Sequence, residues 1–252
     1  MLELSVNIKS NLFAMQQALS KYLVIGSGQM ASHFCHYLKL LNISHQQWAR
    51  NNNSADQLQE FISDASHILL LIKDSEIIKF YNQNANLNSK PCIHFSGSVV
   101  ADNIFGAHPL MTFGKNLYLL KDYQKIPFIL EDTCPDFHKI LPGLPNKSFR
   151  IPKQLKGFYH ALCVLSSNFS CILWQKFFSE LQNTLHLPIE IAKPYLEQTT
   201  KNLLLQPEQA LTGPLMRNDL ETIEANLNAL KNDPFCDVYK AMLKIFKRDY
   251  KL

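Results

Sequence analysis

The chain has 252 residues, of which 46% are hydrophobic and 18% are charged, a composition typical of a folded globular protein. Its 25 basic and 21 acidic residues give a formal net charge of +4 without any block of like charge, so we expect no nucleic-acid partner. Polar residues break the longest apolar stretch, and no continuous apolar region lies near the N-terminus, so we expect neither a membrane span nor a signal peptide.

Six cysteines show no spacing typical of a metal site or a redox motif. We interpret them as reduced thiols that pack as small apolar side chains. This interpretation favours a cytoplasmic location and no bound metal. The cysteines are Cys35, Cys92, Cys134, Cys163, Cys171 and Cys236.

An α/β pattern begins at residue 21, after an N-terminal extension (residues 1–20) to which we assign no function. Short apolar runs alternate with segments of helical period up to residue 151, which is typical of βα units on a mostly parallel sheet. We predict a Rossmann-type, doubly wound dinucleotide-binding domain over residues 21–151. Its predicted strands are 21–26, 43–49, 67–72, 91–97 and 126–132, its first helices are 30–41 and 55–62, and a loop carries Gly106, His108 and Pro109.

The character of the sequence changes after Pro152, because helical period then dominates and β-branched runs become rare. We predict an all-α C-terminal domain over residues 152–252. Its predicted helices are 153–185, 188–205, 219–230 and 234–247.

A glycine turn of the form G-x-G-x-x-A directly follows the first predicted strand and precedes a predicted helix. Gly26 permits a tight turn, Gly28 allows close approach of a pyrophosphate, and Ala31 lets helix and strand pack. The start of the helix offers free N–H groups to phosphates. The alternative is a turn that only joins strand and helix. The predicted cofactor-binding residues of this turn are Gly26, Ser27, Gly28, Gln29, Met30 and Ala31.

Arg50 follows the second predicted strand, where NAD-binding chains usually have an acidic residue for the ribose hydroxyls. An arginine there can pair with a 2′-phosphate, so we expect NADP(H) to be favoured over NAD(H), unless Arg50 is only a solvated loop residue. The ends of later strands place Lys73, Asp74, Ser96 and Gly97 at the same crevice. Lys73 contacts a phosphate, or Asp74 caps the next helix; both interpretations stay open.

Three residues are candidates for catalysis: His108, Lys156 and His160. A histidine can donate to a carbonyl or shuttle a proton, although His108 can equally belong to a structural His-Pro turn. Lys156, His160, Cys163 and Ser167 share one face of the long predicted helix. A polar face on an apolar helix needs a polar partner, which a substrate, a cofactor or a water can provide.

Four further residues are candidates for substrate binding: Ser167, Asn168, Thr212 and Arg217. Asn168 faces another side of its helix than Lys156, so it contacts substrate or ties two helices together as a buried amide. Thr212 begins a turn that leads to Arg217. Arg217 either grips a substrate carboxylate or pairs with Asp219.

These motifs resemble a bacterial family with a Rossmann-like NADP-binding domain and a helical C-terminal domain of unknown function. The matching segments are VIGSGQMA from Val24, FSGS from Phe95, AHPLMTF from Ala107, KGFYHALCVLSSNF from Lys156 and ALTGPLMRND from Ala210. The family is similar to pyrroline-5-carboxylate reductase and the phosphogluconate dehydrogenase superfamily, and the GxHP segment is similar to prephenate dehydrogenases. The resemblance implies an NADP-dependent oxidoreductase that is usually dimeric.

Two departures from the pattern bear on function. Asn218 stands where the family usually has glycine, and His160 stands four residues after Lys156, where the superfamily has a catalytic asparagine. We therefore keep two hypotheses. The first is an NADP-dependent reductase or dehydrogenase of a small carbonyl, imine or hydroxy-acid substrate, dimeric through its C-terminal helices. The second is a non-catalytic NADPH-binding sensor or scaffold.

Overall fold

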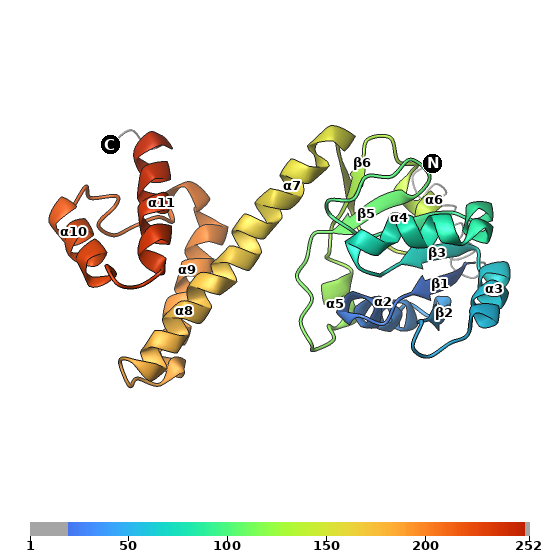
Figure 1. Cartoon of the computed structure of the whole chain (residues 1–252), viewed down its shortest axis with the longest axis horizontal. Helices are drawn as coiled ribbons and strands as arrows, with labels where there is room; N and C mark the ends of the chain where they lie inside the picture. The colour runs from blue at the N-terminus through green and yellow to red at the C-terminus, as the bar shows by residue number, and fades with distance from the viewer. Residues whose placement is uncertain (1–19, 250–252) are drawn as a thin grey trace, which may run out of the picture. The chain divides into compact units, whose positions relative to one another are not determined.

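The computed structural model describes residues 20–249, which divide into two compact units (Figure 1). The first unit ends at Cys171 and the second begins at Ile172. The expected N-terminal extension lies outside the described residues, apart from Ser20. None of the described helices combines the length and the apolar character that a membrane crossing requires.

The first unit contains a seven-stranded sheet in the order β2-β1-β3-β4-β5-β6-β7. Neighbouring strands run parallel except β5 and β6, which are antiparallel. The strands are β1 (Lys21–Ile25), β2 (Ser44–Trp48), β3 (His67–Leu70), β4 (Cys92–His94), β5 (Phe105–Pro109), β6 (Phe128–Glu131) and β7 (Ser148–Ile151). The chain reverses its direction of travel across the sheet after β2, which places a switch point beside β1 and confirms the predicted Rossmann-type fold class.

Helices cover both faces of this sheet. Successive residues of a strand point to opposite faces, so one strand contacts helices on both sides. Tyr22 and Val24 pack in one buried cluster with α2, whereas Leu23 and Ile25 pack in a second cluster with α3 and α4. The helices of this part are α2 (Gln29–Leu40), α3 (Ala55–Asp64), α4 (Asp74–Gln83), the 3-10 helix η1 (Ala85–Ser89), α5 (Leu120–Tyr123) and α6 (Phe137–Ile140). Burial of both faces explains why the strands read as apolar runs.

The expected loop at Gly106, His108 and Pro109 is wrong, because these residues belong to β5. This strand pairs with β4 on one side and with β6 on the other. The strand pattern was hidden because Gly106 has no side chain and His108 is polar, so one face of β5 carries no apolar residue. The carboxyl end of the sheet thus includes a histidine-bearing strand.

One continuous helical stretch follows the sheet, close to the predicted range 153–185. It consists of the 3-10 helix η2 (Lys153–Leu155), α7 (Lys156–Cys163), the π-helix η3 (Val164–Phe169) and α8 (Ser170–Asn183). The hydroxyls of Ser166 and Ser170 donate to the carbonyls of Leu162 and Ser166 at 2.8 and 2.7 Å. Because a π-turn changes the angle per residue, Ser167 is out of the helical register that aligned it with Lys156. The first unit extends to Cys171, beyond the expected domain boundary at Pro152, because α7 packs with the first unit.

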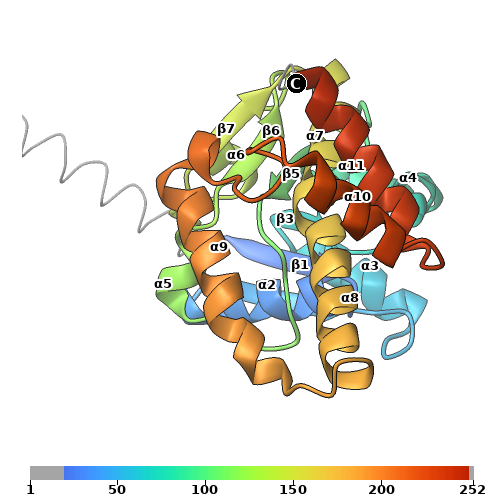
Figure 2. The same ribbon diagram turned by 90° about the vertical axis from the view of Figure 1, so that its left-hand side faces the viewer.

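The second unit is wholly helical in its described part, as the sequence predicts (Figure 2). Its elements after α8 are the 3-10 helix η4 (Ile189–Ala192), α9 (Lys193–Leu205), the 3-10 helix η5 (Pro207–Gln209), α10 (Leu220–Ala229) and α11 (Phe235–Asp249). Asp219 caps α10 by accepting from the backbone N–H of Thr222 at 3.1 Å. Asn218 has a φ of 51°, so the turn keeps a left-handed residue where the family usually has glycine.

Candidate functional site

The glycine turn after β1 is fixed by the backbone around it. Gly26 has a φ of 133°, and a Cβ at this residue would lie 2.1 Å from the carbonyl oxygen of Leu71. Its N–H donates to the carbonyl of Trp48 at 2.9 Å, and its own carbonyl accepts from the side chain of Gln47 at 2.8 Å. Only glycine fits at Gly26, so this residue is required by the fold itself.

Gly28 is different, because a Cβ there would meet no atom within 4 Å. It is the N-cap of α2, which has no side-chain cap and no acidic residue in its first turn. The first N–H groups of the helix therefore face open space and favour an anion. Ala31 is fully buried beneath the turn, in the core between helix and sheet.

An open cleft of about 1160 Å³ lies at this end of the sheet. Its volume is ample for a large organic ligand. The predicted residues that line it are Gly26, Ser27, Gly28, Gln29, Met30, Arg50, Lys73, Asp74 and Ser96. Ala31 and Gly97 are not among the lining residues. The sequence analysis missed Trp48, Asn51, Glu76, Lys79, Phe80, Gln83 and Asn84, which also line the cleft.

The loop that carries Arg50 is held by local hydrogen bonds. The N–H of Ala49 donates to the side chain of Asn53 at 3.1 Å, and the indole of Trp48 donates to the carbonyl of Ser54 at 2.9 Å. Ser54 and Gln57 form a capping box at the start of α3. The backbone is thus ordered, while the exposed Arg50 side chain lines the cleft and can meet an anion.

Asp74 does not cap α4. It is the first residue of the helix, and Lys73 occupies the N-cap position without a side-chain bond. The Asp74 carboxylate accepts hydrogen bonds from the hydroxyls of Ser96 at 2.5 Å and Ser98 at 3.3 Å. These bonds link the ends of β3 and β4 at the edge of the cleft.

Two histidines converge on Gly97, which follows β4. A Cβ at Gly97 would lie 2.5 Å from Cδ2 of His160 and 3.2 Å from Nε2 of His108. The two imidazole rings are perpendicular, with centroids 6.2 Å apart. Nδ1 of His108 is hydrogen-bonded to the hydroxyl of Tyr159 at 2.8 Å. The structure therefore brings together the predicted His108, His160 and Gly97, and adds Tyr159.

The environment of His108 keeps its imidazole neutral at pH 7. Burial lowers the pKa of His108 to about 4, with further lowering by His160 and Lys156, and Asp74 opposes the shift. Burial also raises the pKa of Tyr159 well above its usual value, with a further contribution from Cys163. The pair thus consists of a neutral imidazole and a protonated phenol, and each can donate a hydrogen bond.

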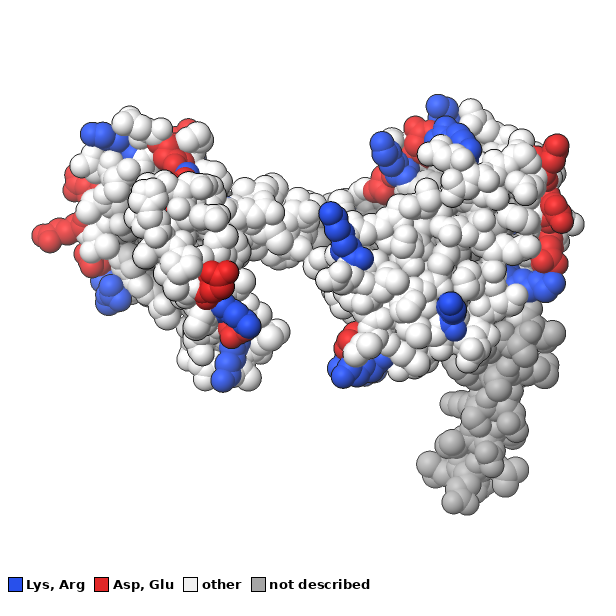
Figure 3. Space-filling view, turned by 90° about the horizontal axis from the view of Figure 1, so that it is seen from below, with Lys and Arg blue, Asp and Glu red and all other residues white. Residues whose placement is uncertain are grey.

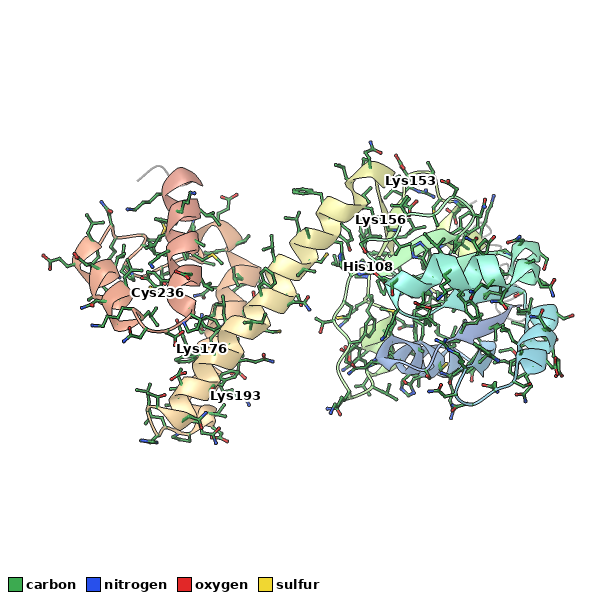
Figure 4. The ribbon with its side chains drawn as sticks, viewed as in Figure 1. His108, Lys153, Lys156, Lys176, Lys193 and Cys236 are labelled. Atoms are coloured by element: carbon green, nitrogen blue, oxygen red, sulfur yellow. The ribbon has the colours of Figure 1, made fainter. Side chains whose placement is uncertain are left out.

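Lys156 is placed differently from the other catalytic candidates. Its ammonium lies 2.5 Å from Oε1 of Glu131, and both side chains are almost fully buried. Figure 4 labels Lys156 and His108 where the start of α7 meets the sheet. Lys156 is not among the residues that line the cleft. Its charge is held in a buried ion pair.

The candidate substrate-binding residues are divided between the two units. Ser167 and Asn168 lie in the π-helix η3, where Ser167 is half-buried and Asn168 is exposed within this chain. Thr212 and Arg217 lie on the second unit and are exposed. Hydrogen bonds from Thr222 lower the pKa of Asp219, and the charge of Arg217 adds to this effect.

Three further residues that lie beside the catalytic candidates escaped the sequence analysis: His94, Glu131 and Tyr159. Tyr159 directly precedes His160 and lies three residues after Lys156, so its helical spacing could have identified it. Glu131 ends a strand that was correctly predicted, and a buried carboxylate there calls for a cation. Nothing in the sequence around His94 indicated a special role. Its relation to the site depends on its neighbour across the sheet, Gly106.

The fold and the glycine turn define a Rossmann-like α/β protein with a helical C-terminal part. Residues 130–245 match the family model described as a domain of unknown function, DUF2520. The stated resemblance to a Rossmann-like family with a helical C-terminal domain is thereby confirmed. No curated protein matches the sequence significantly.

Solved structures share the fold over nearly the whole chain. A candidate NADP oxidoreductase from Bacteroides fragilis is 21% identical, with a TM-score of 0.71 over 91% of this chain and 98% of that one. An imine reductase from Myxococcus stipitatus in complex with NADP+ is 11% identical, with a TM-score of 0.62 over 92% and 94%. A pyrroline carboxylate reductase from Plasmodium falciparum with NADP bound is 14% identical, with a TM-score of 0.55 over 90% and 99%.

Proposed function

We propose that this protein is an NADP-dependent oxidoreductase that reduces a small carbonyl or imine substrate or oxidises the corresponding alcohol, hydroxy acid or amine. The observation that carries the proposal is the open cleft beside the glycine turn, which is lined as far as Ser96, the residue before Gly97, and a neutral His108 lies against Gly97. The names of the structural neighbours, an imine reductase and a pyrroline carboxylate reductase with NADP bound, support the same class of reaction.

In this proposal the pyrophosphate of NADP(H) binds to the first turn of α2, where Gly28 leaves open space. Arg50 pairs with the 2′-phosphate from its ordered loop, and Lys73 adds a positive charge at the cleft. The nicotinamide end lies toward Ser96 and Gly97. The bound cofactor would supply the hydride, and every other part of the chemistry falls to side chains of the protein.

His108 and Tyr159 are the groups that we propose for proton handling, with His160 beside them. When the Tyr159 hydroxyl donates to Nδ1 of His108, the imidazole carries its proton on Nε2, the atom that faces Gly97. A neutral Nε2–H can polarise a carbonyl or imine and donate a hydrogen bond to it. The hydroxyl of Tyr159 then holds the required tautomer.

The cofactor proposal is tested by calorimetric titration of the full chain with NADPH and with NADH. We expect NADPH to bind more tightly, and we expect Arg50→Ala to weaken NADPH about tenfold without a change for NADH, which corresponds to one exposed charged hydrogen bond. Lys39→Ala is the matched control, because it removes an exposed positive charge from the far end of α2. Absence of binding by both nucleotides refutes the proposal.

A second candidate function is an NADPH-binding sensor or scaffold without catalysis. The observation in its favour is Lys156, whose ammonium is buried against Glu131 and is not free for a lysine-asparagine mechanism. The two functions differ in one measurement. Loss of NADPH absorbance with any member of a panel of small ketones, imines and keto acids supports the enzyme, whereas tight binding without turnover over the whole panel supports the sensor.

We also propose that residues 152–252 form a substrate and dimerisation domain, with Ser167, Asn168, Thr212 and Arg217 as its candidate substrate contacts. Apolar side chains on α9, such as Leu204 and Leu205, are 79% and 69% exposed in the single chain and support a homodimer. No charged residue stands between Lys156 and Lys176. On the face that Figure 3 shows, Lys, Arg, Asp and Glu side chains are scattered among other residues. The six free cysteines support a cytoplasmic location.

A further inference from the structure

The space above Gly106 on β5 is filled by the ammonium group of Lys156. A Cβ at Gly106 would lie 2.3 Å from Nζ of Lys156 and 2.8 Å from Oε1 of Glu131. His94, the partner of Gly106 across β4 and β5, borders the same space with Cε1 at 3.2 Å. Gly106 therefore leaves the room in which the buried ion pair forms.

Of the three side chains that border this space, Lys156 and Glu131 carry a charge and His94 is neutral. Burial lowers the pKa of His94 to about 3, and the charge of Lys156 contributes to the shift. The side chains of Lys156 and Glu131 are 4% and 5% exposed. Each charge depends on the other, since an unpaired charge at such a site is strongly unfavourable.

Lys156 is also the first residue of α7, so the ion pair anchors that helix to β6. Tyr159 and His160 follow three and four residues later, which places them one turn further along the same side of the helix. Tyr159 contacts His108, and His160 contacts Gly97. A shift of α7 at Lys156 would move both contacts.

A second lysine at the start of this helical stretch makes a much weaker attachment. Lys153 pairs with Asp102 at 2.8 Å, but the Asp102 side chain is 92% exposed. Exposed pairs contribute little to stability or to position. The anchor is therefore the Lys156–Glu131 pair.

We infer that Lys156 is a positioning residue, which acts through Glu131 and the space above Gly106 to hold Tyr159 and His160 against His108 and Gly97. This inference rests on the proposed function, in which His108 and Tyr159 handle the proton. It assigns Lys156 a role in placing those groups and no contact with the substrate.

The test compares Lys156→Met, Glu131→Leu, the double variant that carries both changes, and the control Lys153→Met. Each single variant leaves one buried charge unpaired, so we expect its melting temperature to fall by roughly 10 °C. Apolar side chains of similar volume fill the space in the double variant, which we expect to recover most of this loss. Lys153→Met remains close to wild type.

The readout specific to positioning is the NMR signal of the His108 ring nitrogens, in which Nδ1 reports its hydrogen bond to Tyr159. We expect both single variants to lose this signature, and the double variant and Lys153→Met to keep it. The affinity for NADPH stays within about twofold in every folded variant, because Lys156 does not line the cleft. If wild type fails to bind NADPH, the proposed function fails while the NMR comparison still tests the inference.

Two outcomes overturn the inference. One is a single variant that is folded and retains the His108 signature. The other is a double variant that lacks the signature or does not fold. If neither single variant folds, the double variant decides the question alone. Once a substrate is found, a kcat for the double variant within about tenfold of wild type supports positioning, since a lysine that contacts the substrate could not be replaced by methionine.

Discussion

Helices α2 and α9 are of similar length but treat their apolar side chains in opposite ways. The 12-residue α2 buries Ala31, Phe34, Tyr37 and Leu38 in a cluster with residues of the sheet, whereas the 13-residue α9 buries none of its residues. The apolar face of α2 is thus buried within the chain. The apolar side chains of α9 are exposed, and we propose that they pack against a second copy of the chain.

The largest effect that breaks this comparison is expected in the first unit, at Gly26. In Gly26→Ala the new Cβ collides with the carbonyl of Leu71, so we expect a loss of about 3 kcal/mol or more in the free energy of unfolding. Gly28→Ala is the matched variant, because its Cβ meets no atom. It should keep the wild-type melting temperature and weaken NADPH at least about tenfold. Normal NADPH binding by Gly28→Ala would argue against the proposed pyrophosphate site.

In the second unit the strongest expected effect is on assembly. We expect the pair of substitutions Leu204→Asp and Leu205→Asp on α9 to weaken a dimer by roughly 100-fold or more, because each removes an exposed leucine that the proposed dimer would bury and adds a charge. Sedimentation at several concentrations measures the change. Lys193→Asp, an exposed change at the other end of the same helix, is a control for added negative charge. A wild-type chain that is monomeric at high concentration contradicts the proposed dimer.

A smaller effect on stability is expected from a buried polar group of the first unit, His94. The pKa of His94 is lowered from 6.5 to about 3, so the unfolded chain takes up a proton on this histidine before the folded chain does. The stability that follows is complete above pH 6.5 and is lost as the pH falls toward 3. For His94 alone the loss amounts to about 2 kcal/mol by pH 5.

The variant His94→Leu removes this contribution, so its free energy of unfolding should change less between pH 7 and pH 5 than that of wild type. Urea unfolding at the two pH values measures the difference. His45→Gln, a change on the edge strand β2, should leave the wild-type pH dependence intact. An equal pH dependence in His94→Leu and wild type would show that His94 is accessible to protons in the folded state.

The smallest expected effect sharpens the description of the Arg50 loop. Ser54→Ala removes the cap of α3, and we expect a loss of about 1 kcal/mol, which lowers the melting temperature by a few degrees. NADPH binding should weaken slightly, because the loop is then held less firmly. Gln59→Ala, an exposed change within α3, is the control. A larger loss of affinity than in Arg50→Ala would mean that the loop backbone is the main recognition element.

Most of the fold could be predicted from the sequence because its strands are buried on both faces. The apolar runs through Val24 and Leu69 are visible without knowledge of any neighbour, and the period of α3 follows from its own residues. β5 was missed because its character depends on other segments. Gly106 and His108 are understandable only once Lys156 and Tyr159, distant in sequence, are brought against them.

The candidate site divides in the same way. The glycine turn is a local pattern, so the place of residues 26–30 in the cleft could be predicted from the sequence. The role of Lys156 did not, because a lysine that faces a ligand and a lysine paired with a buried carboxylate look identical along the chain. Glu131 lies on a strand predicted only for its apolar neighbours, and nothing in its spacing connects it to α7.

The π-helix η3 makes the helical stretch sensitive to the insertion or deletion of a single residue. A π-turn is equivalent to a single residue inserted into an α-helix. Deletion of one residue between Val164 and Phe169 would restore an unbroken α-helix and turn Ser170 and Cys171 by about 100° about the helix axis relative to α7. A single insertion or deletion in η3 therefore changes which residues on its two sides share one face of the helix.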